Sequence, residues 1–162
     1  MYFSKNIHAL IAHLLPTNSI QYLETNLNKT IEQLEKKYLE IPKEESYLIT
    51  TCLNLRKKAL GDFDIEDLRI MIGQNSGLIY LIPLAIKALE NNILAEGDFY
   101  EGDLLKSVLN SDNEFWKNNK LLWEKVIAVF EKNQNILNEA DLGWEIRKEL
   151  FLAFENFKEI NS

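Results

Sequence analysis

The stretch SGLIYLIPLAIKALENN, residues 76–92, decides the fold of this chain. Apolar residues recur there at the spacing of one helical face, and further apolar residues cover the other faces. A helix that is apolar all round is buried on every side, so we expect a central helix over about 77–91. Pro83 removes one backbone hydrogen bond and crowds the carbonyl of Ile79, which predicts a kink or a break at that point.

Helical periodicity also dominates on both sides of this segment, and strand signals are almost absent. Thr30 and Gln33 form a capping-box signature, Ser46 can cap the next helix, and Asp103 can cap a later one. The sequence therefore predicts an all-α fold, a compact bundle of about seven to eight helices. The segments with helical spacing are 7–15, 30–38, 46–58, 64–72, 77–91, 104–109, 122–130 and 142–160, with a turn or short helix at 115–116.

Length and composition are those of an ordinary globular protein. The chain has 162 residues, 46% hydrophobic and 27% charged, which predicts one domain over residues 1–162. Its one cysteine, Cys52, excludes an internal disulfide and suits a reducing compartment. The start of the chain lacks the features of a signal peptide, and the most apolar stretch, 78–86, is too short to span a bilayer. We expect a cytoplasmic monomer without membrane contact.

The net charge of −7 is concentrated in one segment, between Gly61 and Asp103. Only Arg69 and Lys87 are basic in this window. An acidic surface argues against nucleic-acid binding, which needs a basic footprint, and it favours a basic partner. The acidic residues of the window are Asp62, Asp64, Glu66, Asp67, Glu90, Glu96, Asp98, Glu101 and Asp103.

Within this window the tripeptide Glu-Gly-Asp occurs twice, at 96–98 and 101–103, on either side of Phe99 and Tyr100. Glycines permit backbone angles that shape a compact loop, and we expect Phe99 or Tyr100 to fix the loop to the core. These roles leave three carboxylates without a structural task, and we expect them to face solvent. They belong to Glu96, Asp98 and Glu101.

No catalytic or metal-binding constellation is evident in the sequence. The acidic loops do not match the ligand positions of a calcium loop, and His8 and His13 lack the spacing of a zinc site. Cys52 lies on an apolar face without a basic neighbour, which favours a buried structural cysteine. Glycine-rich phosphate-binding motifs are missing. We therefore predict neither an enzyme nor a bound cofactor or metal.

Several sequence blocks resemble one family of bacterial proteins. These blocks are TIEQLEKKY (30–38), EDLRIMIGQ (66–74), PLA (83–85), EGDFYEGDLL (96–105) and EFWKNNKLLWEK (114–125). In this order they are similar to the immunity proteins of contact-dependent growth inhibition systems. The resemblance covers about residues 29–130. The helices expected before and after that range are additional to it.

The resemblance implies a cytoplasmic antidote that binds a toxin delivered by a neighbouring bacterium. Such a toxin is the C-terminal domain of a large secreted surface protein, and many of these toxins are nucleases. A nuclease carries basic surface for phosphates, so an acidic binder suits it independently of the resemblance. We predict that this chain blocks the active site or substrate groove. The residues predicted to bind the toxin are Asp62, Asp64, Glu66, Asp67, Glu96, Asp98, Tyr100 and Glu101.

Two other functions stay open at this point. A helical adaptor or regulatory protein could bind an unrelated cellular partner through the same acidic surface. A hydrolase could use Asp98 or Glu101 with a divalent metal, and metal-dependent thermal stabilisation would support it.

Overall fold

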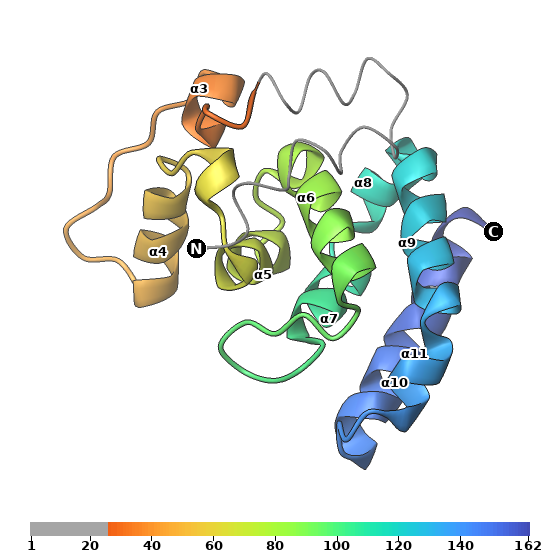
Figure 1. Cartoon of the computed structure of the whole chain (residues 1–162). Helices are drawn as coiled ribbons and strands as arrows, with labels where there is room; N and C mark the ends of the chain where they lie inside the picture. The colour runs from red at the N-terminus through yellow and green to blue at the C-terminus, as the bar shows by residue number, and fades with distance from the viewer. Residues whose placement is uncertain (1–25) are drawn as a thin grey trace. The chain divides into compact units, whose positions relative to one another are not determined.

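The computed structural model describes residues 26–162, and the helix expected at 7–15 lies outside this range. The described residues contain nine α-helices, α3 to α11, two short 3-10 helices, and no strand beyond a single bridge between Thr30 and Ala59 (Figure 1). The all-α prediction is confirmed. These residues fall into two compact units, 26–64 and 65–162. The expectation that residues 1–162 form one domain stays a prediction.

The first unit holds α3 (Ile31–Glu35), α4 (Tyr47–Leu55) and the 3-10 helix η1 (Leu60–Asp62). The predicted capping box is present, since the Thr30 hydroxyl accepts from the Gln33 N–H and the Gln33 side chain accepts from the Thr30 N–H. Ser46 caps α4 by accepting from the Ile49 N–H.

Helix α3 is shorter than the sequence predicts. It ends at Glu35 rather than near residue 38, because Lys36 takes a left-handed conformation with φ of 52°. The Glu32 carboxylate then accepts the Leu39 N–H at 3.2 Å, which holds the chain after the turn.

The second unit is built around the predicted central helix, α6 (Leu78–Asn91), which contacts α5, α7 and α9. The remaining helices follow the acidic loop and continue to the C-terminus (Figure 1). The bounds in this unit are α5 (Ile65–Gly73), α7 (Asp103–Leu109), α8 (Asn113–Asn118), α9 (Lys120–Lys132), α10 (Gln134–Glu139), α11 (Trp144–Lys158) and the 3-10 helix η2 (Glu159–Asn161).

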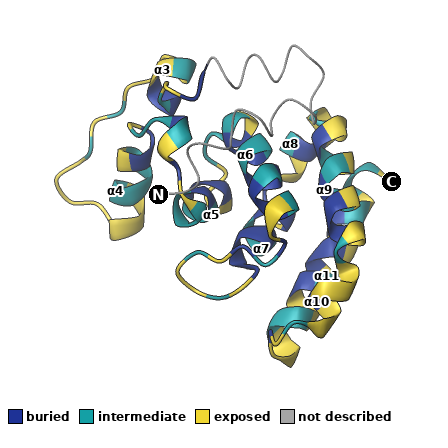
Figure 2. Cartoon of the chain, viewed as in Figure 1, coloured by how far each residue is buried: buried dark blue, intermediate teal, exposed yellow. Residues whose placement is uncertain are grey.

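Helix α6 continues through Pro83 without a break. Leu81 and Ile82 are fully buried and Leu89 is 1% exposed, so the helix is the core element that its composition predicts (Figure 2). It is not buried on every side, however. Ile79 keeps half of its surface exposed.

An aromatic cluster joins the helices after α7. The fully buried Trp116 meets Phe157 edge to face, with ring centroids 4.9 Å apart, and its indole N–H donates to Ser111. Phe130 stacks on Phe154 at 3.7 Å between centroids. These contacts fix α8 and α9 against α11.

Helix α10 is the one α-helix of the described range that the sequence analysis does not predict. Its sequence, QNILNE, has no amphipathic period long enough to recognise. Leu137 of this helix is fully buried. Tertiary packing, rather than a local preference of the sequence, therefore supports the helix.

Replacing Leu81 or Leu89 by Ala should lower the free energy of unfolding by about 2–5 kcal/mol, because each substitution leaves a cavity in the core. Ile79→Ala on the same helix is the matched control and should change it by less than about 0.5 kcal/mol. Urea unfolding of the three variants measures both effects. Equal losses at Leu81 and Ile79 would contradict the burial of α6.

Candidate protein-binding site

The acidic loop, residues 92–102, connects α6 to α7 (Figure 1). It carries the first glutamate–glycine–aspartate tripeptide, and the second tripeptide ends at Asp103, the first residue of α7. The backbone of the loop is fixed from within the second unit. The Gly97 N–H donates to the Asp103 carboxylate at 2.7 Å, and the Phe99 N–H donates to it at 3.2 Å. The Gly102 N–H closes the loop on the carbonyl of Leu94 at 3.2 Å.

The sequence predicts that Asp103 caps α7, and this prediction is wrong. Asp103 is the first residue of that helix, and the N-cap position is Gly102, which has no side chain to cap with. The carboxylate is 4% exposed and turns back into the loop, where two N–H groups and the Arg69 guanidinium at 3.7 Å satisfy it. A buried carboxylate needs such partners, because its desolvation is costly.

Glu66 and Arg69, one helical turn apart on α5, form a second support for the loop. Two guanidinium nitrogens of Arg69 donate to the two carboxylate oxygens of Glu66, each at 2.6 Å. The same carboxylate accepts the Asp98 N–H at 2.9 Å. The bond to Arg69 lowers the pKa of Glu66 below its ordinary range, although burial opposes the change.

The two glycines of the loop have different tasks. A Cβ at Gly97 would collide with the Glu66 carboxylate and come within 3.1 Å of the Asp103 carboxylate, so a side chain at this position would displace these groups from the backbone. Gly102 has φ of +90°, which other residues resist. A Cβ there would also lie 3.2 Å from Leu150 of α11.

Phe99 does not fix the loop to the core, which corrects the first of the two alternatives that the sequence suggests. Its side chain is 68% exposed, and the Arg69 guanidinium lies 4.4 Å from the ring centroid. Tyr100 is half-buried, with the ammonium of Lys106 5.9 Å from its ring centroid. Lys106 is itself paired with Glu149, and this pairing is the main cause of its raised pKa.

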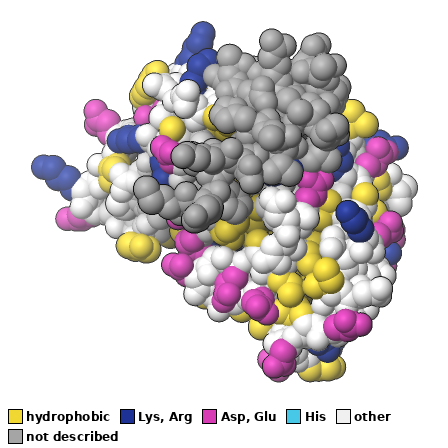
Figure 3. All heavy atoms as spheres, in the orientation of Figure 1, with side chains coloured by type: hydrophobic (Ala, Val, Ile, Leu, Met, Phe, Trp, Pro, Cys, Tyr) yellow, Lys and Arg dark blue, Asp and Glu magenta, His cyan; other side chains and the backbone are white. Residues whose placement is uncertain are grey.

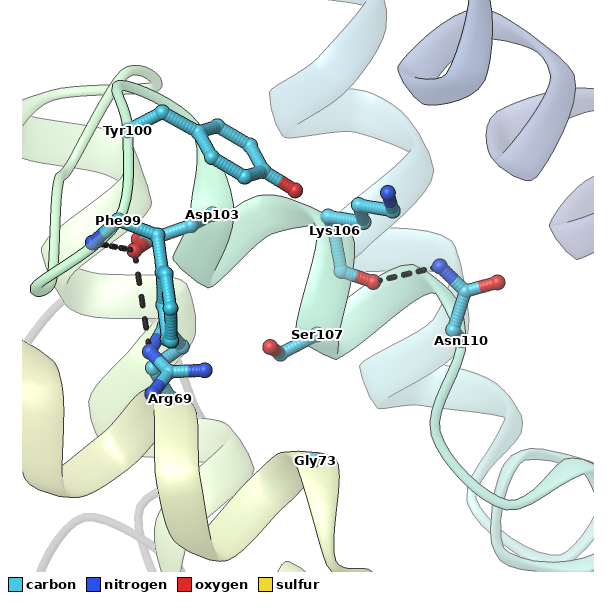
Figure 4. Close-up of a pocket in the computed structure, with 8 residues that line it drawn as sticks. All are labelled: Arg69, Gly73, Phe99, Tyr100, Asp103, Lys106, Ser107 and Asn110. Atoms are coloured by element: carbon cyan, nitrogen blue, oxygen red, sulfur yellow. Dashed lines mark hydrogen bonds and ion pairs between the residues drawn. The ribbon is translucent and has the colours of Figure 1, made fainter. Parts of the chain in front are cut away.

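A pocket of about 350 Å³ lies between the loop, α5 and α7 (Figure 4). Phe99 and Tyr100 line it on the loop side, and hydrogen-bonding side chains line it on the helix side. Its residues are Arg69, Gly73, Phe99, Tyr100, Asp103, Lys106, Ser107 and Asn110.

The three carboxylates left without a structural task, Glu96, Asp98 and Glu101, are all exposed, as the sequence predicts. Figure 3 shows acidic side chains gathered where the loop lies in Figure 1. Tyr100 borders the same surface. The structure thus brings together four of the eight residues predicted to bind a partner.

The other four predicted residues are placed differently. Asp62 and Asp64 are exposed but belong to the first unit, and Asp67 is half-buried on α5. Glu66 points its carboxylate at Arg69 and the loop backbone, so it positions the loop.

The described part of the chain gives little support to metal binding, cysteine chemistry or membrane insertion. Residues 26–162 contain no group of three or more His, Cys, Asp or Glu side chains placed to hold a metal ion; His8 and His13 lie outside that range. Cys52 is half-buried rather than buried, and desolvation raises the pKa of its thiol, which disfavours the nucleophilic thiolate. None of the helices described is both long and apolar enough to cross a membrane.

Comparison with known proteins identifies a family. A family model described as CDI immunity proteins, where CDI is contact-dependent growth inhibition, matches residues 30–126. The chain belongs to this family. No curated protein and no solved structure matches this chain. The family range contains the acidic loop, both of its carboxylate supports and every residue of the pocket.

Sequence reasoning missed Asp103 and Arg69 as supports of the loop. The spacing of Glu66 and Arg69, three residues apart on a helix, was a signal for their ion pair. No local signal could place Asp103 against the N–H groups of Gly97 and Phe99, because that contact exists only once the loop has closed.

Asp103→Asn should lower the free energy of unfolding by about 1–3 kcal/mol, because an amide group replaces one of two buried acceptor oxygens that face N–H donors. Asp98→Asn removes the same charge from the exposed side of the loop and should have almost no effect. Thermal or urea unfolding measures both. If Asp103→Asn left the free energy of unfolding unchanged, the carboxylate would not be the group that fixes the loop.

The support from Glu66 should depend on pH. Its folded pKa is lowered, so its stabilising contribution is present above the ordinary value of 4.5 and is lost as the pH falls through the folded value. The loss of stability caused by Glu66→Gln should therefore be largest near neutral pH and shrink below pH 4.5. Unfolding of both proteins across this range measures the difference, and a constant difference would contradict the ion pair.

Proposed function

We propose that this protein is a cytoplasmic antidote that binds the toxin domain of a contact-dependent growth inhibition system and neutralises it by occupying its active site or substrate groove. The observation that carries the proposal is the family match over residues 30–126. Neutralisation of this kind needs binding alone, so no catalytic group is required.

The acidic loop suits a basic partner. Glu96, Asp98 and Glu101 are exposed on a backbone that their side chains do not help to hold, so their charge is available to another protein. Opposite charges on two surfaces speed their encounter and fix their relative orientation. A nuclease toxin offers such a surface, since it must attract phosphates. We therefore propose a nuclease as the toxin.

The remaining predicted residues take secondary places in this proposal. Asp62, Asp64 and Asp67 extend the acidic character of the chain, and Tyr100 borders the loop surface. Glu66 acts through the loop that it holds rather than by touching the toxin, because Arg69 and the Asp98 N–H already occupy its carboxylate.

Co-expression of the full chain with the toxin domain encoded beside its gene tests the function directly. The two proteins should co-purify, and cells that express both should survive. If the two do not associate while cells still require this protein for another process, the adaptor function is supported instead.

Replacing Glu96, Asp98 and Glu101 together by their amides should slow toxin association and flatten its dependence on salt, because the steering charge is removed. The melting temperature should hardly change, since exposed carboxylates contribute little to stability. Stopped-flow association measured from about 0.01 to 0.1 M salt, over which the screening length falls from about 30 to 10 Å, gives the slope.

The matched control removes three other exposed carboxylates from the second unit, those of Glu131, Glu139 and Asp141. It changes the net charge by the same amount but leaves the loop intact. An equal effect of both triple variants would mean that overall charge, and not the loop, steers association. An unchanged rate and slope in the loop variant would place the interface elsewhere.

A further inference from the structure

Phe99 is one of four large aromatic side chains that the described residues expose, together with Tyr38, Tyr47 and Trp144. The side chain of Phe99 keeps 68% of its surface in solvent, whereas Trp116, Phe130, Phe154 and Phe157 keep 1% or less. A single exposed apolar side chain is common and carries no conclusion by itself. Phe99 differs because the structure holds it in that exposed position.

Three features fix the ring in place. Its own N–H donates to the buried Asp103 carboxylate, and the preceding N–H, of Asp98, donates to Glu66. Its ring lies against the guanidinium of Arg69, which Glu66 holds in turn. The ring therefore loses little conformational freedom when a partner covers it, and this preorganisation favours tight binding.

The surroundings of the ring have the composition of an interface centre. Phe99 and Tyr100 form one wall of the 350 Å³ pocket, and Arg69 and Lys106 line its helix side (Figure 4). Aromatic residues and arginine are the types that dominate binding energy at interfaces, and they do so in the middle of a polar rim. Exposed carboxylates supply that rim here.

We propose that Phe99 is the main energetic contact of the loop with the toxin, inserting into an apolar slot that basic side chains surround, while a toxin side chain fills the pocket beside the ring. This inference rests on the proposed function. The charge of the rim indicates which toxin surface fits. Glu96, Asp98 and Glu101 flank Phe99 along the chain, so lysine or arginine side chains should surround the slot on the toxin.

Two kinds of residue thus act at different stages of binding. The carboxylates act at a distance and set the association rate. Phe99 acts only on contact, so its loss raises the dissociation rate.

The test uses the full chain and the toxin domain encoded beside its gene, with rates measured by surface plasmon resonance. Phe99→Ala should weaken binding by at least about 30-fold, through faster dissociation, and leave the salt slope of association unchanged. Phe99→Leu, which keeps an apolar side chain over Arg69, should give a smaller loss in the same direction. Melting temperatures confirm that each variant is folded at the temperature of measurement.

Trp144→Ala is the matched control. Trp144 is 70% exposed and carries a lysine, Lys148, 4.8 Å from its ring centroid, so it resembles Phe99 in exposure and in its cationic neighbour. It lies outside the family range and should leave the affinity unchanged.

The outcomes separate the two proposals. If the wild type binds and folded Phe99→Ala binds within about 3-fold of it, the inference is wrong and the proposed function stands. Equal losses for Phe99→Ala and Trp144→Ala would also overturn the inference. A wild type that does not bind the toxin domain overturns the proposed function and the inference with it.

Discussion

The second unit depends on one buried charge, the carboxylate of Asp103, at the point where the acidic loop meets α7. It is 4% exposed, accepts two N–H groups from the loop and lies 3.7 Å from the Arg69 guanidinium. A carboxylate in this position would destabilise the fold if its partners were absent, because desolvation of the charge would not be offset. The loop, α5 and α7 therefore meet at this group, and Glu66 of α5 adds the second support of the loop.

Acidic residues in this short region have two opposite tasks. Asp103 and Glu66 point inward and accept hydrogen bonds from the backbone of the loop, whereas Glu96, Asp98 and Glu101 point outward. The chemical type is the same, and geometry alone decides the role. A count of charges along the chain cannot separate the two groups, because both belong to the same acidic window.

Local patterns predicted much of the fold. The composition of residues 77–91 predicted α6, and the Thr30–Gln33 signature predicted the capping box. Such features depend on residues within one or two turns of each other. Features that exist only in the folded structure were missed. Leu137 of α10 is buried by the rest of the fold, and Asp103 accepts hydrogen bonds from the closed loop instead of capping α7.

The candidate site divides in the same way. Exposure of Glu96, Asp98 and Glu101 followed from the lack of any structural task for them. The exposure of Phe99 could not be predicted from the sequence, because an aromatic residue between two glycines can be either buried or exposed. Its position depends on Arg69, thirty residues earlier in the chain, and on a pocket that three separate elements create.

The way in which the loop is held leaves its side chains free to change. The carboxylates of Asp103 and Glu66 both accept hydrogen bonds from backbone N–H groups, which every residue except proline possesses. Substitution at positions 98 and 99 therefore keeps these bonds, provided that Gly97 stays small enough for the close approach. A lineage can therefore alter the exposed surface of the loop while the scaffold beneath stays the same. The side chains of the loop can diversify at little risk to folding.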